Sequence, residues 1–372
     1  MPRPIFALAP MEEVTDVAFR EMFARYSKSR NIGKSEYRNR QTSEFSDTSD
    51  SPTSGFVMYT EFVNVDGLTH PEGRKKLAID LKFTPQQKPM VAQIWGTNPE
   101  KFYESAKICA ELGFDGIDIN MGCPQDKEIG IGACAALIRE PKLAKQIIEA
   151  VKKGAGGLPV SVKTRIGYSK KEEMEEWIKH LLSCEPAVIA LHGRTKQEKS
   201  KVPANWEAIA QAVQIRNQEK SHTLILGNGD IKSYQEGLDR VAQTKVDGVM
   251  VGRGAFGNPW FFRFGAENPK EGFPLPTSPA APASPFQSFI GREINSSANN
   301  LSYQPVLKER LAVMLEHAKL FTEWLPEKSF MIMRKHFKAY ASGFPGSHEL
   351  RAKLMEAKNL AETEKIAKEF LS

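Results

Sequence analysis

At residues 116–124 the chain reads Gly116-Ile117-Asp118-Ile119-Asn120-Met121-Gly122-Cys123-Pro124. Residues 117–121 have the composition of a buried strand. Gly122 frees the backbone to turn, and Pro124 stops the strand because it has no N–H to donate to a ladder. The segment predicts a strand that ends by presenting a thiol at its carboxyl end, where α/β folds carry out chemistry. A free cysteine is equally often a small buried apolar residue, so this segment alone leaves both interpretations of Cys123 open.

Seven further segments have the length and apolar composition of strands, and helical patterns lie between most of them. The predicted strands are 5–11, 57–63, 89–96, 117–121, 159–165, 188–191, 223–226 and 246–251. The predicted helices are 12–26, 99–112, 133–152, 171–182, 205–215 and 234–242. This alternation over about 250 residues predicts an α/β fold, the (β/α)8 TIM barrel. A doubly wound sheet is the competing fold. The barrel is favoured because polar residues follow nearly every strand, as expected when all carboxyl ends face one mouth.

Three regions differ in composition from this barrel, which we assign to residues 1–265. Residues 27–55 are polar without apolar periodicity, which predicts a flexible insertion. Residues 266–302 are rich in proline and serine and predict a linker or surface insertion. Residues 303–372 have helical periodicity and predict a small C-terminal all-helical domain, with a last helix at 349–371. About 70 residues is a small core, so we expect this domain to dock on the barrel.

The overall composition narrows the class of protein. The chain has 372 residues, a net charge of +6 and no apolar run long enough to cross a membrane. No secretory signal is recognisable at the N-terminus. The four cysteines form no C-x-x-C pair, which argues against zinc and a disulfide framework. We therefore expect a cytoplasmic protein with no bound metal and no membrane partner, and the mild positive charge is compatible with a polyanion.

The last two predicted strands end in glycine-rich turns, Gly227-Asn228-Gly229-Asp230 and Gly252-Arg253-Gly254. Barrels often bind phosphate at these two strand ends through loop amides. Incidental turn glycines remain the alternative. The match of Gly252-x-Gly254-x-x-Gly257 to the dinucleotide fingerprint is rejected, because a proline-rich segment follows it and no second strand ending in an acid does.

Polar residues at the middle strand ends complete the predicted cavity. Gln93, Lys163, Arg165 and His192 would supply a neutral hydrogen-bonding group, two cations and a titratable ring around one mouth. A phosphate site beside such a cavity suggests a phosphorylated cofactor. The electron-rich edge of a flavin would favour a nearby lysine, so flavin mononucleotide (FMN) on a barrel fits the pattern.

Motifs from every predicted strand end resemble, in order, those of the tRNA-dihydrouridine synthase family, most closely its bacterial B-type branch. They are Ala9-Pro10-Met11, Tyr59-Thr60-Glu61, Gln93-Ile94-Trp95-Gly96, Asn120-Met121-Gly122-Cys123-Pro124, Lys163-Thr164-Arg165, His192-Gly193-Arg194-Thr195, Gly227-Asn228-Gly229-Asp230 and Gly252-Arg253-Gly254. The tail resembles the RNA-binding domain of that family through Met333-Arg334-Lys335-His336-Phe337-x-x-Tyr340, Gly343-x-Pro345-Gly346 and Leu350-Arg351.

The resemblance implies a monomeric oxidoreductase that reduces the 5,6 double bond of selected uridines in tRNA. FMN, itself reduced by NADPH or NADH, would deliver hydride to C6, and Cys123 would protonate C5. The residues that the resemblance assigns to FMN are Pro10, Met11, Gln93, Lys163, His192, Asn228, Gly229, Asp230, Gly252 and Arg253. Those that it assigns to tRNA are Asn120, Arg165, Arg334 and Lys335. The target base must leave its stack to reach a barrel mouth.

The segment after Pro124 departs from the family pattern. Lys127 and Gly130-Ile131-Gly132 match loosely, in a loop a few residues shorter than the pattern, and we interpret Cys134 as a packing residue. Two other functions remain alternatives. An FMN barrel that reduces a small pyrimidine or an enone is disfavoured because it would not need the helical tail. A non-catalytic RNA-binding protein is disfavoured because Cys123 and the cavity residues are all present.

Overall fold

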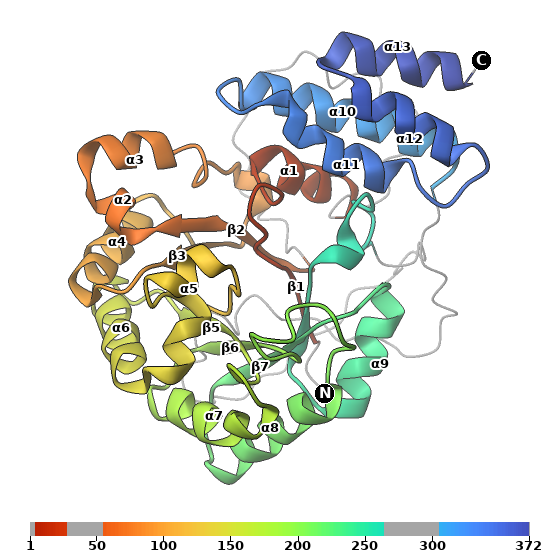
Figure 1. The fold of residues 1–372 in the computed structure, drawn as a ribbon. Coiled ribbons are helices and arrows are strands. Elements are labelled where there is room, and N and C mark those ends of the chain that lie inside the picture. Colours follow the sequence, from red (N-terminus) through yellow and green to blue (C-terminus); the bar gives the residue numbers. More distant parts are fainter. Residues whose placement is uncertain (1–3, 28–54, 264–304, 372) are drawn as a thin grey trace, which may run out of the picture.

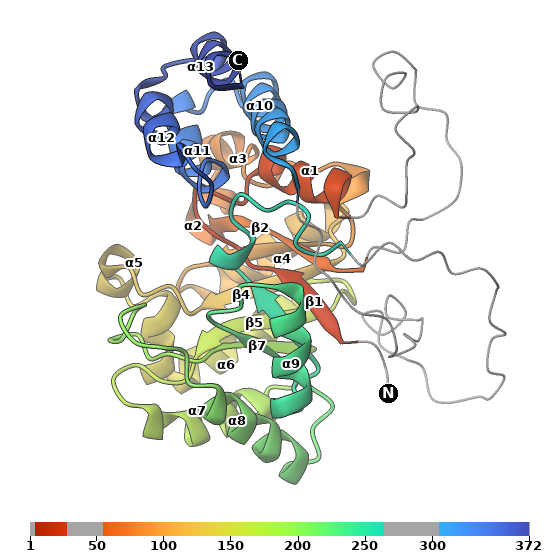
Figure 2. The same ribbon diagram turned by 90° about the vertical axis from the view of Figure 1, so that its right-hand side faces the viewer.

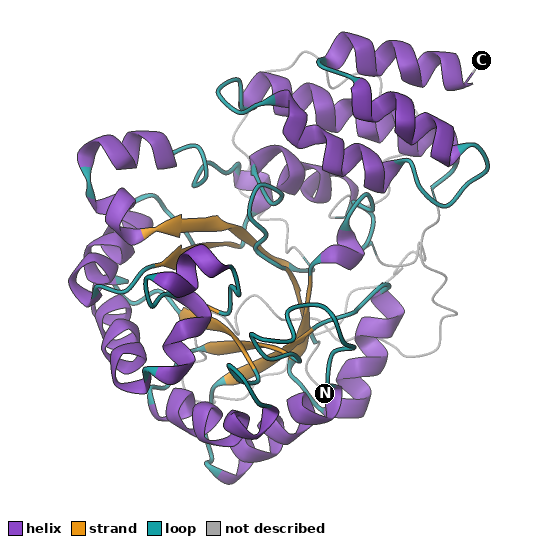
Figure 3. Cartoon of the chain, in the orientation of Figure 1, coloured by secondary structure: helices purple, strands orange, loops and turns teal. Residues whose placement is uncertain are grey.

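The structure is a computed structural model, and it describes residues 4–27, 55–263 and 305–371. Eight parallel strands pair in chain order and close into a barrel. Figure 1 and Figure 3 show these strands as an inner ring with helices around it. The strands are β1 (Ile5–Leu8), β2 (Val57–Asn64), β3 (Met90–Trp95), β4 (Gly116–Met121), β5 (Val160–Arg165), β6 (Val188–His192), β7 (Leu224–Asn228) and β8 (Gly248–Val251). The linker predicted at 266–302 lies outside the described residues, as does the insertion predicted at 27–55 apart from its two end residues.

Closure of the barrel comes from the pairing of the first strand with the last. Ile5 lies opposite Gly248, and Leu8 lies opposite Val251. This pairing confirms the predicted (β/α)8 barrel and excludes the doubly wound sheet, which has two free edges. The strand β1 ends three residues earlier than predicted, and the following Ala9-Pro10-Met11 continues into the loop at the mouth.

Helices cover the barrel, and further helices form the C-terminal region. Around the barrel lie α1 (Val17–Tyr26), α2 (Val65–Thr69), α3 (Pro71–Leu77), α4 (Pro99–Glu111), α5 (Asp126–Gly130), α6 (Pro141–Gly154), α7 (Met174–Ser183), α8 (Trp206–Gln218) and α9 (Tyr234–Thr244). The C-terminal region contains α10 (Leu307–Trp324), α11 (Met333–Tyr340), α12 (Ser347–Glu356) and α13 (Leu360–Leu371). The main apolar core lies between the strands and the helices, and a smaller one that includes Tyr59, Val91, Leu226 and Met250 has its side chains on the other face of the strands.

Two predicted helices are each divided in the structure. The helix predicted at 133–152 is a 3-10 segment, Cys134–Arg139, followed by α6. Pro141 separates the two because proline disfavours helical geometry in the residue before it and is well suited to begin a helix. The last predicted helix, 349–371, is α12 and α13. The side chain of Asn359 accepts a hydrogen bond from the N–H of Glu362 at 2.9 Å and so begins a new helix.

The C-terminal helices pack on the side of the barrel that carries α1, as Figure 2 shows. Val17, Ala18 and Met22 of α1 belong to the same apolar cluster as Met314 and Phe337 of the C-terminal region. A shared core of this kind fixes the position of these helices on the barrel, as expected for a small helical region that has little core of its own.

Two buried histidines, His317 of α10 and His336 of α11, lie within this interface. Both are fully buried, and their ring centroids are 4.7 Å apart. Phe19 packs against both rings, and Phe256 stacks on His336. No nitrogen of either ring has a hydrogen-bond partner among the described residues. Burial lowers the pKa of His317 to about 3 and the pKa of His336 well below 6.5, so both rings are neutral in the folded protein.

We expect the folded protein to lose stability as the pH falls below about 6.5. In that range the unfolded chain binds a proton at each of these histidines and the folded chain does not, so each contributes a loss of up to about 1.4 kcal/mol per pH unit. Urea unfolding at pH 7.5, 6.5 and 5.5 measures the loss. The double variant His317→Leu/His336→Leu should flatten the pH dependence. An unchanged slope in the double variant would contradict this account.

Candidate active site

The turn after β4 is held from both sides. The side-chain oxygen of Asn120 accepts hydrogen bonds from the backbone N–H of Gly122 at 3.0 Å and of Cys123 at 2.9 Å. On the carbonyl side, Arg165 donates from Nε to the Gly122 oxygen at 2.6 Å. Gly122 itself approaches β5 closely, since a Cβ there would lie 3.3 Å from the carbonyl oxygen of Lys163. These contacts give the turn that carries Cys123 one fixed conformation.

A chain of side-chain hydrogen bonds sets the orientation of Asn120. Gln93 lies opposite Asp118 in the β3–β4 register, and its Nε2 donates to the Asp118 carboxylate at 2.6 Å. Its Oε1 then accepts from Nδ2 of Asn120 at 3.0 Å. A carboxylate only accepts hydrogen bonds, so Asp118 must face the NH₂ group of Gln93. The oxygen of Gln93 then faces the NH₂ group of Asn120, and the oxygen of Asn120 faces the turn. Asp118 also accepts from Ser161, and burial raises its pKa to about 6.

We expect Asn120→Ala to destabilise the fold by about 1–3 kcal/mol, because it leaves two N–H groups of the turn and the Gln93 oxygen without their partner. A looser turn should also make Cys123 react faster with iodoacetamide. Urea unfolding and the alkylation rate at Cys123 measure the two effects. Asn120→Asp keeps the accepting oxygen for the turn and serves as the matched variant, with a smaller increase in alkylation. An alkylation rate unchanged in Asn120→Ala would show that the turn does not depend on this side chain.

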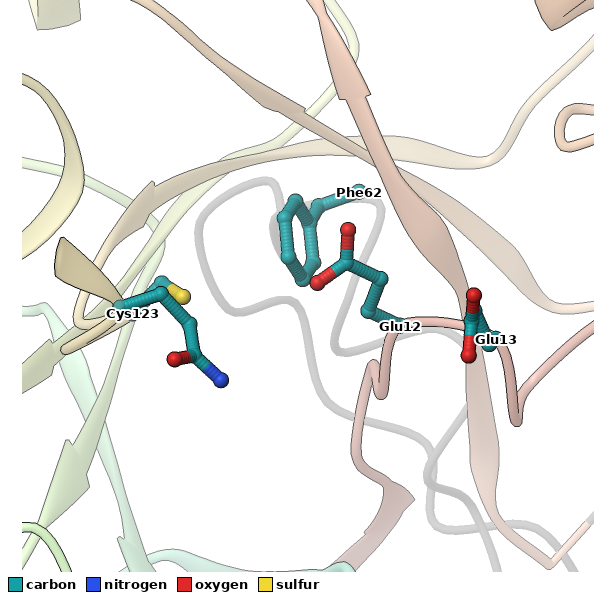
Figure 4. A pocket seen from close by; sticks show the side chains of 5 residues that line it. Glu12, Glu13, Phe62 and Cys123 are labelled. Atoms are coloured by element: carbon teal, nitrogen blue, oxygen red, sulfur yellow. The ribbon is translucent and has the colours of Figure 1, made fainter. Parts of the chain in front are cut away.

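Cys123 lines a cavity of about 520 Å³ at the barrel mouth, together with Glu12, Glu13, Phe62 and Gln125. Figure 4 shows the side chains of Glu12, Phe62 and Cys123 around this space. Burial raises the pKa of Glu12, and so do the carboxylates of Glu128 and Glu13. The cavity therefore combines a thiol, an apolar ring and a carboxylic group that holds its proton more tightly than usual.

The surroundings of Cys123 lower the pKa of its thiol. The neighbouring Cys134 thiol has the largest effect, greater than the opposing effect of burial, and the backbone N–H of Gln125 lowers the pKa further. Cys134 itself is fully buried beside Trp95 and Ala133, as the packing interpretation predicted, and its pKa is raised by its hydrogen bond to Cys123 and by burial. A thiol with a pKa closer to neutral is a more effective proton donor at neutral pH.

A group of cations lies at the ends of β5 to β8. Its members are Lys163, Arg165, Arg194 and Arg253, and all four contribute to lowering the pKa of His192, after burial itself. Burial and the nearby Arg165 also lower the pKa of Lys163 to about 8. Arg194 Nη1 lies 3.1 Å from Nε2 of His192. Arginine only donates, so Nε2 accepts and the neutral His192 ring carries its proton on Nδ1.

The residues predicted for the phosphate lie near one another. Lys163 donates to Oδ1 of Asn228 at 3.3 Å, and Asn228 anchors itself by donating to the Met250 carbonyl at 2.7 Å. A Cβ on Gly252 would lie 3.6 Å from the sulfur of Met11, which places the end of β8 beside the loop after β1.

Asp230 has another role in the structure. Its carboxylate pairs with Arg194 and, at 3.5 Å, with Arg253. These ion pairs hold two arginines at the ends of β6 and β8. Gly229 next to it has φ 133°, a conformation that glycine adopts without strain.

The two tRNA-binding residues predicted in the tail lie in different surroundings. Lys335 forms an ion pair of 2.9 Å with Glu13, which lines the cavity. Arg334 instead donates to the carbonyls of Glu356 and Ala357 at the end of α12, at 3.4 and 3.5 Å. Lys335 therefore reaches the rim of the cavity, whereas the contacts of Arg334 are within the helical region.

Several residues of the site are not predicted from the sequence, among them Asp118, Arg194 and Glu12. Asp118 was read only as a strand residue, although a carboxylate between two isoleucines in a buried strand is itself a signal. Arg194 lies in the motif His192-Gly193-Arg194-Thr195, but the sequence predicts no function for it. Glu12 follows the quoted Pro10-Met11 by one residue, and nothing in its local pattern indicates that it lines a cavity with Cys123.

Among residues 4–27, 55–263 and 305–371, no helix has the length and apolar character needed to cross a membrane. The same part of the chain contains no group of three or more His, Cys, Asp or Glu side chains arranged to hold a metal ion.

Comparisons with known proteins cover the whole length of the chain. A family model described as "Dihydrouridine synthase (Dus)" matches residues 7–372. A "Probable tRNA-dihydrouridine synthase" of Staphylococcus aureus (strain MRSA252) is 35% identical over 372 residues, which is 100% of this chain and 94% of that protein. A "Probable tRNA-dihydrouridine synthase 2" of Bacillus subtilis (strain 168) is 36% identical over 100% of this chain and 95% of its own length.

Among solved structures, the old yellow enzyme homologue from Zymomonas mobilis aligns with 69% of this chain and 86% of its own. The identity is 12% and the TM-score is 0.42. A similarity this weak carries no conclusion about cofactor or substrate.

Proposed function

The chain belongs to the dihydrouridine synthase family, and from that premise we propose that it reduces the 5,6 double bond of selected uridines in tRNA. The observation that carries this proposal is the Cys123 turn. Asn120 and Arg165 hold it at the carboxyl end of β4, and its thiol lines a cavity large enough to admit a base. A positioned proton donor of lowered pKa at a barrel mouth is what protonation of a carbon atom requires.

The proposed cofactor is FMN, and the groups at the ends of β5 to β8 fit it. Four cations surround His192 there, and Asp230 is the carboxylate paired with two of them, so the region carries an excess of positive charge suited to a phosphate. We assign the phosphate to the backbone and side chains at Asn228, Gly229, Gly252 and Arg253, with Asp230 orienting Arg253. Lys163, with its pKa near 8, and Nδ1–H of His192 would donate to the flavin ring, beside Pro10 and Met11.

In the proposed reaction, the hydride for C6 of the uracil would come from bound FMN, which NADPH or NADH would reduce. Cys123 gives its proton to C5, and the donors from Cys134 and Gln125 stabilise the thiolate that remains. Gln93 would position Asn120 through the bond at its Oε1, and the second N–H of its amide would donate to the flavin. Arg165 and Asn120 act by holding the turn and present their remaining surface to the base.

We further propose that residues 1–265 form the catalytic domain and residues 303–372 a tRNA-binding domain. Lys335 on α11 reaches Glu13 at the cavity rim, so an RNA backbone lying along α11 would come close to the Cys123 cavity. Phosphate can replace Glu13 as the partner of Lys335. Arg334 would contribute less, because it already donates to the end of α12.

The test uses the purified full-length chain. We expect a yellow protein whose flavin is released on denaturation, and which with NADPH forms dihydrouridine in tRNA taken from a strain lacking this gene, as measured by nucleoside mass spectrometry. A colourless protein that fails to take up FMN would contradict both the proposed function and the alternative FMN-dependent reductase. A flavoprotein that reduces small enones or free pyrimidines and leaves tRNA unchanged would support the alternative FMN reductase. Unchanged dihydrouridine at every tRNA position in the deletion strain would also contradict the proposal.

A further inference from the structure

Cys123 and Cys134 form a thiol pair at the barrel mouth. Ten residues separate them in the chain, yet the Cys123 side chain packs against the small apolar cluster to which Cys134 belongs. Their backbones also meet, since the N–H of Ala135 donates to the carbonyl of Cys123 at 3.3 Å. Both side chains contact the same small apolar cluster with Trp95. A backbone contact and a side-chain contact together place the two sulfurs within reach of each other.

The two thiols differ in access. Cys123 is partly exposed and lines the cavity, whereas Cys134 is fully buried. Cys134 also has φ 54°, in the left-handed region that a non-glycine residue seldom adopts. Strained backbone of this kind persists only where surrounding contacts impose it, and it is concentrated at functional sites. The geometry therefore presents one sulfur to solutes and keeps a second sulfur behind it.

We propose that Cys123 and Cys134 are a reactive and a resolving cysteine that a hydroperoxide joins in a reversible disulfide. The Cys123 thiolate attacks the peroxide, the O–O bond breaks, and Cys123 becomes a sulfenic acid as the alcohol or water leaves. The Cys134 thiol then attacks that sulfur. The S–O bond breaks, water leaves with the thiol proton, and the S–S bond forms. A dithiol reductant reverses the step by thiol exchange.

The disulfide has a direct consequence for the cavity. A bond to the buried Cys134 draws the sulfur of Cys123 away from the space that it lines and removes its proton. The loss of activity that follows rests on the proposed function. Formation of the bond does not, because the bond is detected on the protein itself.

The experiment is peptide mapping of the full-length chain after exposure to hydrogen peroxide. Trypsin cleaves after Lys107, Lys127 and Arg139, so Cys123 falls in peptide 108–127 and Cys134 in peptide 128–139. A Cys109→Ala background removes the second thiol of the first peptide. We expect a non-reducing digest to contain the two peptides joined, about 2 Da lighter than their sum, and dithiothreitol to separate them. Activity on tRNA should fall and return with the same treatments.

The matched variant is Cys134→Ser, which keeps a hydrogen-bond donor and removes the resolving sulfur. Its Cys123 should proceed to sulfinic acid, which dithiothreitol does not reverse. Cys134→Ala provides the same test if serine is not accepted in the apolar cluster. Absence of the joined peptides in oxidised Cys109→Ala protein would overturn the proposal, as would recovery after oxidation that is equal with and without Cys134. A protein that forms the joined peptides but does not act on tRNA would contradict the proposed function alone.

Discussion

The Cys123→Ala protein is expected to keep its fold and its flavin but to reduce uridine in tRNA about 10²–10⁴-fold more slowly, the usual contribution of a positioned acid. The substitution removes the thiol, while the bonds of Asn120 and Arg165 to the turn go to backbone atoms and remain. Single-turnover reduction of tRNA by the NADPH-reduced protein measures the loss. Flavin reduction by NADPH, followed by absorbance, should be unchanged.

Cys184→Ala is the matched control for Cys123→Ala. Cys184 is buried at the end of α7, where its thiol donates to the His180 carbonyl at 3.3 Å. This variant should reduce tRNA at the rate of the unmodified protein. If Cys123→Ala also kept that rate, another group would have to supply the C5 proton, and Glu12, which faces the same cavity and has a raised pKa, would be the first to substitute.

Lys328→Met is expected to lower the free energy of unfolding by about 3–5 kcal/mol, the usual effect of removing one partner from a buried ion pair. Lys328 lies in the loop after α10 and is 2.8 Å from Glu61 and 2.7 Å from Asp80. The Glu61 side chain is only 6% exposed, so the variant would leave its charge buried without a cation. The substitution would also weaken the contact between the helical region and the barrel. Urea unfolding at pH 8 measures the change.

The pH dependence of the stability of Lys328→Met tests whether the buried charge of Glu61 causes the loss. Burial raises the pKa of Glu61 to about 7 even with Lys328 nearby, and without Lys328 it should rise further. When a carboxyl has a higher pKa in the folded than in the unfolded protein, its protonation stabilises the folded state. The loss of unfolding free energy in Lys328→Met should therefore shrink as the pH falls from 8 to 5. The double variant Lys328→Met/Glu61→Gln should recover much of the stability at pH 8. A loss that is equal at both pH values would contradict the buried-charge explanation.

Hydrogen bonds within the protein give two of the predicted site residues a positioning role that their local sequence does not indicate. Gln93, predicted to contact the cofactor, also links Asp118 to Asn120 through its amide. Arg165, predicted to contact substrate, also donates to the carbonyls of Gly122 and Thr195. In both cases the residue type and strand position were informative, because they placed a polar group at the mouth. The bonding partners come from other strands and could not be read from the local sequence.

The sequence by itself determined the eight strands, the helical tail and the position of Cys123 at the end of β4. These follow from short-range chemistry: apolar runs of strand length, helical spacing, and prolines and glycines that stop them. Sequence interpretation missed the helix breaks at Pro141 and Asn359, because it continued one helical pattern across each position.

Only the tertiary structure decided which groups meet. Barrel closure sets Gln93 opposite Asp118, Asn120 opposite Lys163, and His192 opposite Asn228. Docking of the helical region brings Lys328 to Glu61, and the segment after Pro124 folds back to bring Cys134 to Cys123. The register of a closed sheet and the packing of distant helices depend on all the strands together. The partners of a side chain are therefore a property of the whole fold, whereas its place at the end of a strand is a property of its neighbours in the chain.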